Sequence, residues 1–175
     1  DCFLSNANVD PLTATIEELA HAAGADTGLR QSIGGERDDW LDLILTTRVA
    51  PSFEPHRLTV LRHYPASQAA LARLCPKDSR VADRFEVFLG TVELANGYVE
   101  LLDAEEQATR IERDNEERRH RRRTIRPHDS KLLAALESGL PACAGVAVGF
   151  ERLQMIFADT QDMRDVITFS FETAP

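Results

Sequence analysis

Two acids, Glu86 and Glu93, flank a segment whose composition is typical of a β-hairpin. If Leu89 and Gly90 form a two-residue turn, Glu86 faces Glu93 directly across the two strands. Carboxylates placed in this way have Cβ atoms about 5 Å apart and repel each other unless something lies between them. Magnesium favours one or two carboxylates plus phosphate oxygens, so the pair predicts a nucleotide site. Hydrated acids on a solvent-facing hairpin remain the alternative.

The same polar line continues beyond Glu93 with Asn96 and Glu100, separated by Gly97. A glycine in a strand lets a ligand or another backbone approach closely. A sheet face that carries these acceptors must satisfy them, and an ammonium group would do so through charge-assisted hydrogen bonds. We therefore expect a substrate that bears an amine. An ordinary salt-bridge network with the many arginines is the alternative.

A third candidate is Arg152, which follows the small residues Gly145, Ala147 and Gly149. The pattern predicts a short, buried strand and then a helix, with Arg152 in the first helical turn, where backbone amides and the arginine suit a phosphate. Small side chains on the strand would let a flat ring or a substrate chain lie against it. The same pattern also occurs in close packing without a ligand.

Histidines and cysteines show no spacing typical of a catalytic or metal site. His21, His63, His120 and His128 form no triad or metal motif, and His56 lies in a proline-flanked loop. Cys2, Cys75 and Cys143 are far apart and lack a C-x-x-C pair. We expect reduced, structural cysteines and surface or structural histidines.

The elements that must position these residues follow from caps, periodicity and breakers. Thr15 and Glu18 have capping-box spacing and predict a helix to Gly24, followed by a loop over residues 25–37. The sequence next predicts a second helix around Trp40, a strand from 58 to 61 and a hairpin from 84 to 100. It then predicts a capped helix from Asp103, a helix from 131 to 138, a strand from 145 to 149 and a last helix. Grouped strands without regular βαβ alternation predict an α+β fold in which an antiparallel β-sheet is flanked by helices.

Composition bounds the class of protein. The 175 residues, 43% of them hydrophobic, suit a single domain, 1–175, with a helical part from 1 to 57 and a sheet-bearing part from 58 to 175. The net charge of −9 argues against extensive nucleic-acid binding, although the basic run 118–123 is either a solvated helix end or a docking surface. With no apolar stretch long enough to span a bilayer, we expect no membrane association and a cytoplasmic location.

These motifs, taken as a set, resemble the lysine-specific class II aminoacyl-tRNA synthetases and, within that fold, the elongation factor P–lysine ligase family. The resemblance covers most of residues 58–172 and rests on RFEVF at 84–88, ELANGYVEL at 93–101, DAEEQ at 103–107, GVAVGFERL at 145–153 and RDVI at 164–167. The segment YPASQAALA at 64–72, Ala147 in place of the usual synthetase glycine and, more weakly, the 10–12 region are similar to the ligases.

The resemblance implies ATP and Mg²⁺ as cofactors and lysine or β-lysine as the substrate, activated as an adenylate and passed to a lysine of elongation factor P. Glu86 and Glu93 would hold the magnesium, and Arg152 and Glu93 would be catalytic. The ATP site would comprise Glu86, Glu93, Leu94, Gly149 and Arg152. The substrate site would comprise Ser67, Gln68, Asn96, Tyr98, Glu100 and Ala147. The alanine at 147 would favour β-lysine.

Two class II motifs are not recognisable, namely the dimer-interface motif and the motif whose arginine grips the α-phosphate. We therefore expect the chain to match the C-terminal half of such a domain, the full-length protein to be a homodimer, and the 175 residues alone to be inactive or nearly so. A lysyl-tRNA synthetase core that charges tRNA(Lys) is the alternative function. A noncatalytic amino-acid-sensing or interaction module is the alternative from another class.

Overall fold

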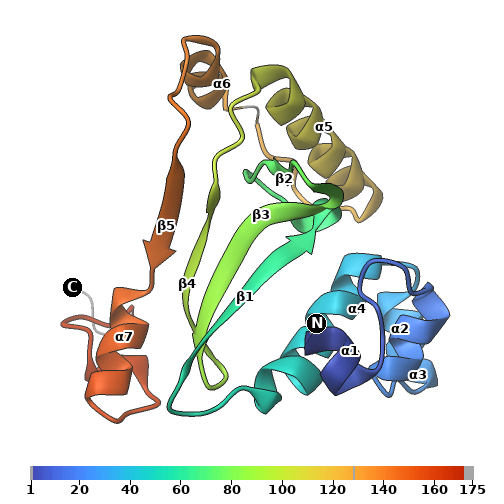
Figure 1. Ribbon diagram of the computed structural model, residues 1–175, viewed down its shortest axis with the longest axis vertical. Coiled ribbons are helices and arrows are strands. Elements are labelled where there is room, and N and C mark those ends of the chain that lie inside the picture. Colours follow the sequence, from blue (N-terminus) through green and yellow to red (C-terminus); the bar gives the residue numbers. More distant parts are fainter. Residues whose placement is uncertain (1, 128, 172–175) are drawn as a thin grey trace.

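The computed structural model describes residues 2–127 and 129–171, and His128, for which no role is predicted, lies outside these ranges. The chain folds as helices, then an antiparallel hairpin, then further helices around a last strand (Figure 1). The α-helices are α1 Cys2–Ala7, α2 Ile16–Ala22, α3 Thr27–Ile33, α4 Arg37–Ile44, α5 Ala104–His120, α6 Ser130–Glu137 and α7 Phe150–Phe157. The strands are β1 Leu58–Pro65, β2 Leu74–Cys75, β3 Asp78–Leu89, β4 Val92–Val99 and β5 Ala144–Val148. The predicted α+β class, an antiparallel sheet with flanking helices, is confirmed.

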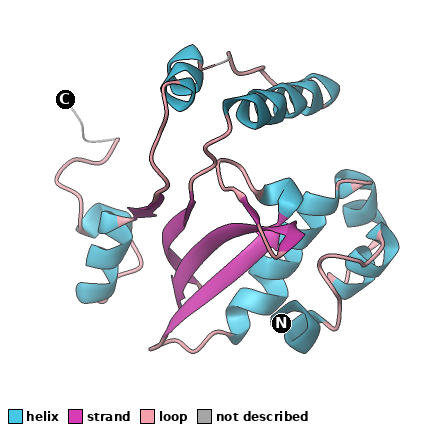
Figure 2. Ribbon diagram, turned by 45° about the horizontal axis from the view of Figure 1, so that its top comes forward, coloured by secondary structure: helices cyan, strands magenta, loops and turns pink. Residues whose placement is uncertain are grey.

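Every strand pairing in the described chain is antiparallel, and the strands lie in the order β1-β3-β4-β5. The short strand β2 pairs with β3 on the edge opposite β1, since Ala82 has both Tyr64 and Leu74 as partners. Figure 2 shows β1, β3 and β4 as one twisted sheet, with the N-terminal helices at one edge and α7 beyond the other. The long strand β3 is therefore the centre to which the remaining elements are attached.

The N-terminal helices α1 to α4 pack around their own apolar core. Trp40, Leu19, Ile44 and Val49 are its largest fully buried side chains. The predicted capping box of α2 is confirmed, because the Thr15 hydroxyl accepts from the Glu18 amide and the Glu18 carboxylate accepts from the Thr15 amide.

The loop predicted over residues 25–37 is wrong. It contains α3, whose first turn is capped by the Asp26 side chain accepting from the Leu29 amide at 2.8 Å. Beyond α4 the chain continues through a π-helical turn, Leu45–Val49, and a 3-10 turn, Ala50–Ser52, before it enters the sheet.

The predicted register of the hairpin is wrong. Its turn is formed by residues 90 and 91, and a bulge beside Val87 shifts the pairing of β3 with β4. Glu86 consequently faces Asn96 and Glu93 faces Phe88, so the two acids are not cross-strand partners. The bulge places one extra residue, Leu94, in β4, so the pairing on one side of it is shifted by one residue relative to the other side.

Strand β5 is also not buried as predicted. All of its residues, Ala144–Val148, are exposed, although they pair with β4 along their length. Helix α7 begins at Phe150 directly after Gly149, so Arg152 lies in its first turn as predicted. No helix in the described chain is both long and apolar enough to cross a membrane.

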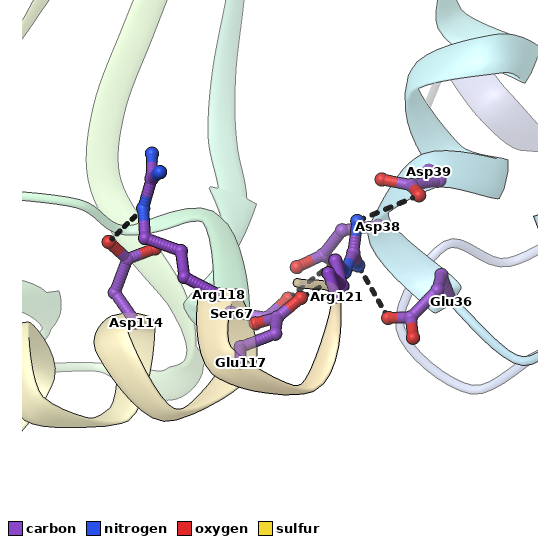
Figure 3. A network of polar contacts seen from close by, with 8 residues as sticks. All are labelled: Glu36, Asp38, Asp39, Ser67, Asp114, Glu117, Arg118 and Arg121. Carbon is purple, nitrogen blue, oxygen red and sulfur yellow. Dashed lines mark hydrogen bonds and ion pairs between the residues drawn. The ribbon is translucent and has the colours of Figure 1, made fainter. Parts of the chain in front are cut away.

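The N-terminal helices and the basic run meet at the end of α5, as Figure 3 shows. Arg121 forms ion pairs with Glu36 at 2.5 Å, Asp39 at 3.1 Å and Glu117 at 2.7 Å. Arg118 pairs with Asp114 at 3.1 Å. Much of the positive charge of the run is thus neutralised within the chain, and a role in docking stays a prediction.

Candidate active site

Arg84 is the centre of the candidate site. From β3 it donates to the Glu86 carboxylate at 2.7 Å, to the Gln68 carbonyl oxygen at 2.8 Å and to Asn96 Oδ1 at 3.4 Å. Its guanidinium also lies 4.4 Å from the centre of the Tyr64 ring. One arginine therefore joins β1, the turn after it, β3 and β4.

Arg84 and Tyr64 were not predicted as site residues from the sequence, yet a signal was available. Alternate residues of a strand share a face, so Arg84 had to lie beside Glu86. An arginine two residues before a buried carboxylate suits a charge-assisted pair. Tyr64 could not be placed in this way, because its position depends on the pairing of β1 with β3.

Tyr64 brings a buried hydroxyl to the same face. Burial raises the pKa of its phenol far above the ordinary value, and the carboxylates of Glu86 and Glu93 raise it further. The hydroxyl therefore stays protonated and can act only as a neutral donor or acceptor. Its oxygen is buried and makes no hydrogen bond of good geometry within the described chain, although the Glu86 carboxylate is close enough to act on it.

Glu86 and Glu93 lie on one face of the sheet although they do not face each other. Phe88 shares a face with Glu86, two residues before it, and Glu93 pairs with Phe88 across the hairpin, so both acids project from that face. Glu86 is buried, with 8% of its surface exposed, and pairs with Arg84. Glu93 is half-buried and pairs with Arg152 at 3.5 Å. Each acid thus has a cationic partner, which removes the repulsion that a directly opposed pair would suffer.

Arg152 connects α7 to the hairpin. It donates to the Glu93 carbonyl oxygen at 2.8 Å, and the amide of Gly149 donates to the Leu94 carbonyl oxygen at 2.8 Å. A Cβ on Gly149 would lie 3.3 Å from Cδ of Arg152, so the glycine leaves room for the arginine to fold back over β4. The structure brings Glu93, Leu94, Gly149 and Arg152 together, and their role in binding ATP stays a prediction.

The far end of β4 carries Asn96, Tyr98 and Glu100. Asn96 faces Ala147 across β4 and β5, and Tyr98 faces Gly145. The Glu100 carboxylate lies 3.1 Å from where a Cβ on Gly145 would be, so it points over β5 beside them. Burial raises the pKa of the Tyr98 phenol, and the Glu100 charge adds to the rise. These residues form a polar strip along one face, all of them half-buried except the exposed residues of β5.

Gly97 does not face this strip. A Cβ there would lie 2.6 Å from Cζ of Phe85 and 2.7 Å from the carbonyl oxygen of Gly145. The glycine therefore admits an aromatic ring and a neighbouring backbone on the opposite face, rather than a ligand.

Ser67 and Gln68 lie in a 3-10 turn, Ala66–Gln68, directly after β1. Ser67 Oγ donates to Asp38 at 2.7 Å and Gln68 Nε2 donates to Asp42 at 2.8 Å. Partial desolvation raises the pKa of the Asp42 carboxyl, although much of the residue remains exposed. Helix α4 thus fixes the turn whose Gln68 carbonyl oxygen accepts from the site arginine. Asp38 and Asp42 were not predicted to position this turn, because they are 26 residues or more away from it in the sequence.

Comparison with known proteins shows the family to which the chain belongs. Residues 42–173 match the family described as tRNA synthetases class II (D, K and N). The chain belongs to this class II tRNA synthetase family. The match begins within α4 and runs through the hairpin, β5 and α7, so it includes every residue of the predicted site.

Curated relatives within this class II family carry the name elongation factor P--(R)-beta-lysine ligase. The chain is 43% identical to the one from Photorhabdus laumondii over 173 residues, which is 98% of this chain and 53% of that protein. It is 44% identical to the one from Pseudoalteromonas translucida over 168 residues, or 95% and 52% of the two chains. The chain therefore spans about half the length of the curated relatives that it matches.

Proposed function

We propose that the full-length protein activates lysine or β-lysine with ATP as an adenylate and transfers it to a lysine of elongation factor P. One observation carries the proposal. A single face of the hairpin combines two arginine-paired acids, Glu86 and Glu93, with the polar strip that ends in Glu100, in a chain whose relatives are named for this ligation.

Nucleotide binding would use the end of the face beside α7. Glu86 and Glu93 offer the hard oxygen ligands that magnesium prefers, and the ion would offset negative charge on the phosphates. Arg152, held over β4 by the Glu93 carbonyl oxygen, would contact a phosphate, with Gly149 and Leu94 bordering the nucleotide. Because Glu93 and Arg152 already pair, they would reach the ligand as one preorganised unit.

The amine-bearing substrate would lie along the strip of β4 and β5. Glu100 and Asn96 supply a charge and an amide oxygen for ammonium groups. Tyr64 and Tyr98 supply aromatic walls, and protonated phenols there add no negative charge of their own. Ser67 and Gln68 would close the far side, held in place from α4.

Ala147 bears on the choice between the two forms of lysine. It lies directly opposite Asn96, so its methyl group borders the place where an ammonium group would bind. The resemblance to the ligases implies that an alanine at this position favours β-lysine over lysine. Replacing Ala147 with glycine would then raise the use of lysine relative to β-lysine.

ATP–pyrophosphate exchange by the full-length protein tests the first step. Arg152→Ala should lower the lysine-dependent exchange rate by about 10²–10³-fold, as expected for loss of one donor to a developing charge. Arg57→Ala is the matched control, because Arg57 pairs with Glu54 at an exposed position outside the site. Wild-type exchange by Arg152→Ala would overturn the assignment. Whether the 175 residues alone are inactive stays a prediction that the same assay tests.

A further inference from the structure

A second group of metal-ligating side chains lies apart from the candidate active site. His63, Cys75 and Asp83 come from β1, β2 and β3, and each offers one ligand atom. These three atoms all lie within 4.8 Å of one another. Ligand atoms of one tetrahedral zinc ion are about 3.3–3.6 Å apart, so side-chain rotations that bring the three atoms about 1.5 Å closer would complete the site.

Irregular backbone brings the three side chains together. His63 has a φ of 62° in the bulge of β1, where the register with β3 shifts between Arg62 and Tyr64. A histidine in the left-handed region is uncommon and turns its side chain out of the regular alternation of the strand. The register of β2 with β3 also shifts, between Leu74 and Cys75. Sequence spacing could not show this convergence, because every ligand lies on a different strand.

The cluster lies behind the candidate active site rather than within it. Asp83 precedes Arg84 on β3, and successive side chains of a strand point to opposite faces. His63 lies in the bulge of β1, so its place in the cluster follows from its distances to Cys75 and Asp83 rather than from alternation. A ligand at the cluster would therefore hold the two backbone segments that present Arg84 and Tyr64, without occupying the face on which they meet Glu86.

The charges around the cluster leave room for a cation. Asp83 pairs with Arg73 at 2.8 Å through one oxygen, which leaves its other oxygen as a possible ligand. Asp78 lies close enough to His63 for their charges to interact, although its carboxylate is held mainly by Arg80. The Asp83 and Asp78 carboxylates would thus balance the positive charge of a divalent ion, whereas Arg73 would repel it.

We propose that His63, Cys75 and Asp83 bind a divalent transition-metal ion of the zinc class. The combination of nitrogen, sulfur and oxygen donors suits zinc or cobalt and disfavours magnesium, which requires oxygen ligands. Three protein ligands leave a fourth position for water. Bound metal would cross-link β1, β2 and β3. This site goes beyond the proposed function and does not depend on it.

Cobalt binding tests the proposal directly. The reduced, tag-free full-length protein is titrated with Co²⁺, and the near-ultraviolet absorption of thiolate-to-cobalt charge transfer reports on cysteine ligation. Cys75→Ser should abolish this absorption, and Cys143→Ser, which replaces an exposed cysteine outside the cluster, should leave it intact. Absence of the band from the wild-type protein, or its retention in Cys75→Ser, would overturn the proposal.

Zinc affinity supplies a second measurement that does not depend on the thiol. His63→Ala and Asp83→Asn should each weaken Zn²⁺ binding by at least about tenfold, since even partners beyond the direct ligands contribute that much. His56→Ala should bind as the wild type does. Zn²⁺ should also raise the melting temperature of the wild type, whereas Mg²⁺ should not do so through this site. Equal zinc affinity in all of these variants would show that the three residues are not the ligands.

Discussion

Replacing Glu86 with glutamine tests how strongly the site is built around Arg84. The two side chains pair at 2.7 Å with only 10% of Glu86 and 18% of Arg84 exposed. Removing one partner of a buried pair costs about 3–5 kcal/mol. Arg84 would retain the Gln68 carbonyl oxygen and the Tyr64 ring, and the glutamine oxygen could still accept. Because these contacts remain, we expect a loss at or below the lower end of that range, about 2–3 kcal/mol in the free energy of unfolding.

Urea unfolding of the full-length protein without ligands measures this loss. Glu54→Gln is the matched control, since Glu54 pairs with Arg57 at 3.2 Å but both side chains are more than 60% exposed, at 68% and 74%. That exposed pair should contribute less than about 1 kcal/mol. A double-mutant cycle with Arg84→Gln isolates the coupling between the partners. If Glu86→Gln lost no more stability than Glu54→Gln, the central role given to Arg84 would be wrong.

Three further predictions concern positions outside that pair. Gly97→Ala should cost about 1–3 kcal/mol of stability, because the new methyl group would clash with the Phe85 ring and a backbone oxygen. Gly28→Ala is the control, because its methyl group would make only an ordinary contact at 3.5 Å. Equal urea midpoints for the two variants would contradict this prediction. Arg121→Ala should increase hydrogen exchange in α4 and at the end of α5, because the ion pairs of Arg121 join these two helices. Unchanged exchange would show that this contact does not restrain α4. Hydrogen bonds from Arg80 lower the pKa of Asp78 from 3.8 to about 2, so this carboxylate stabilises the fold above pH 3.8 and the stabilisation is lost as the pH falls through 2. Asp78→Asn should therefore flatten the stability profile between pH 4 and 2, and an unchanged slope would refute that assignment.

The predictable parts of the fold are those that depend on neighbours in sequence. The Thr15 capping box, the Asp103 and Asp129 caps and the hairpin were all recoverable, because each is decided by residues within one turn or one strand. Helix α3 was missed because its glycine and polar residues resemble a loop, although its Asp26 cap was a usable signal. Exposure of β5 could not be predicted, since apolar, small residues fit a buried strand as well as an exposed one.

The candidate site divides in the same way. Asn96 and Glu100 could be assigned to one face from strand alternation, but the bulge, which the sequence did not show, is what puts Glu86 and Glu93 on that face with them. The bulge beside Val87 altered which residues face one another without separating the two acids. Contacts from α4 to the turn after β1 had no local signal. They depend on how the N-terminal helices pack against the sheet, and that packing involves residues distant in sequence.

Whether elongation factor P accepts the activated substrate is the central question. The full-length protein is incubated with ATP, (R)-β-lysine and either elongation factor P or tRNA(Lys), and the mass of each acceptor is measured. We predict that elongation factor P gains one β-lysyl group and that the tRNA is unchanged. Gain of mass by the tRNA alone, or by neither acceptor, would contradict the proposed function.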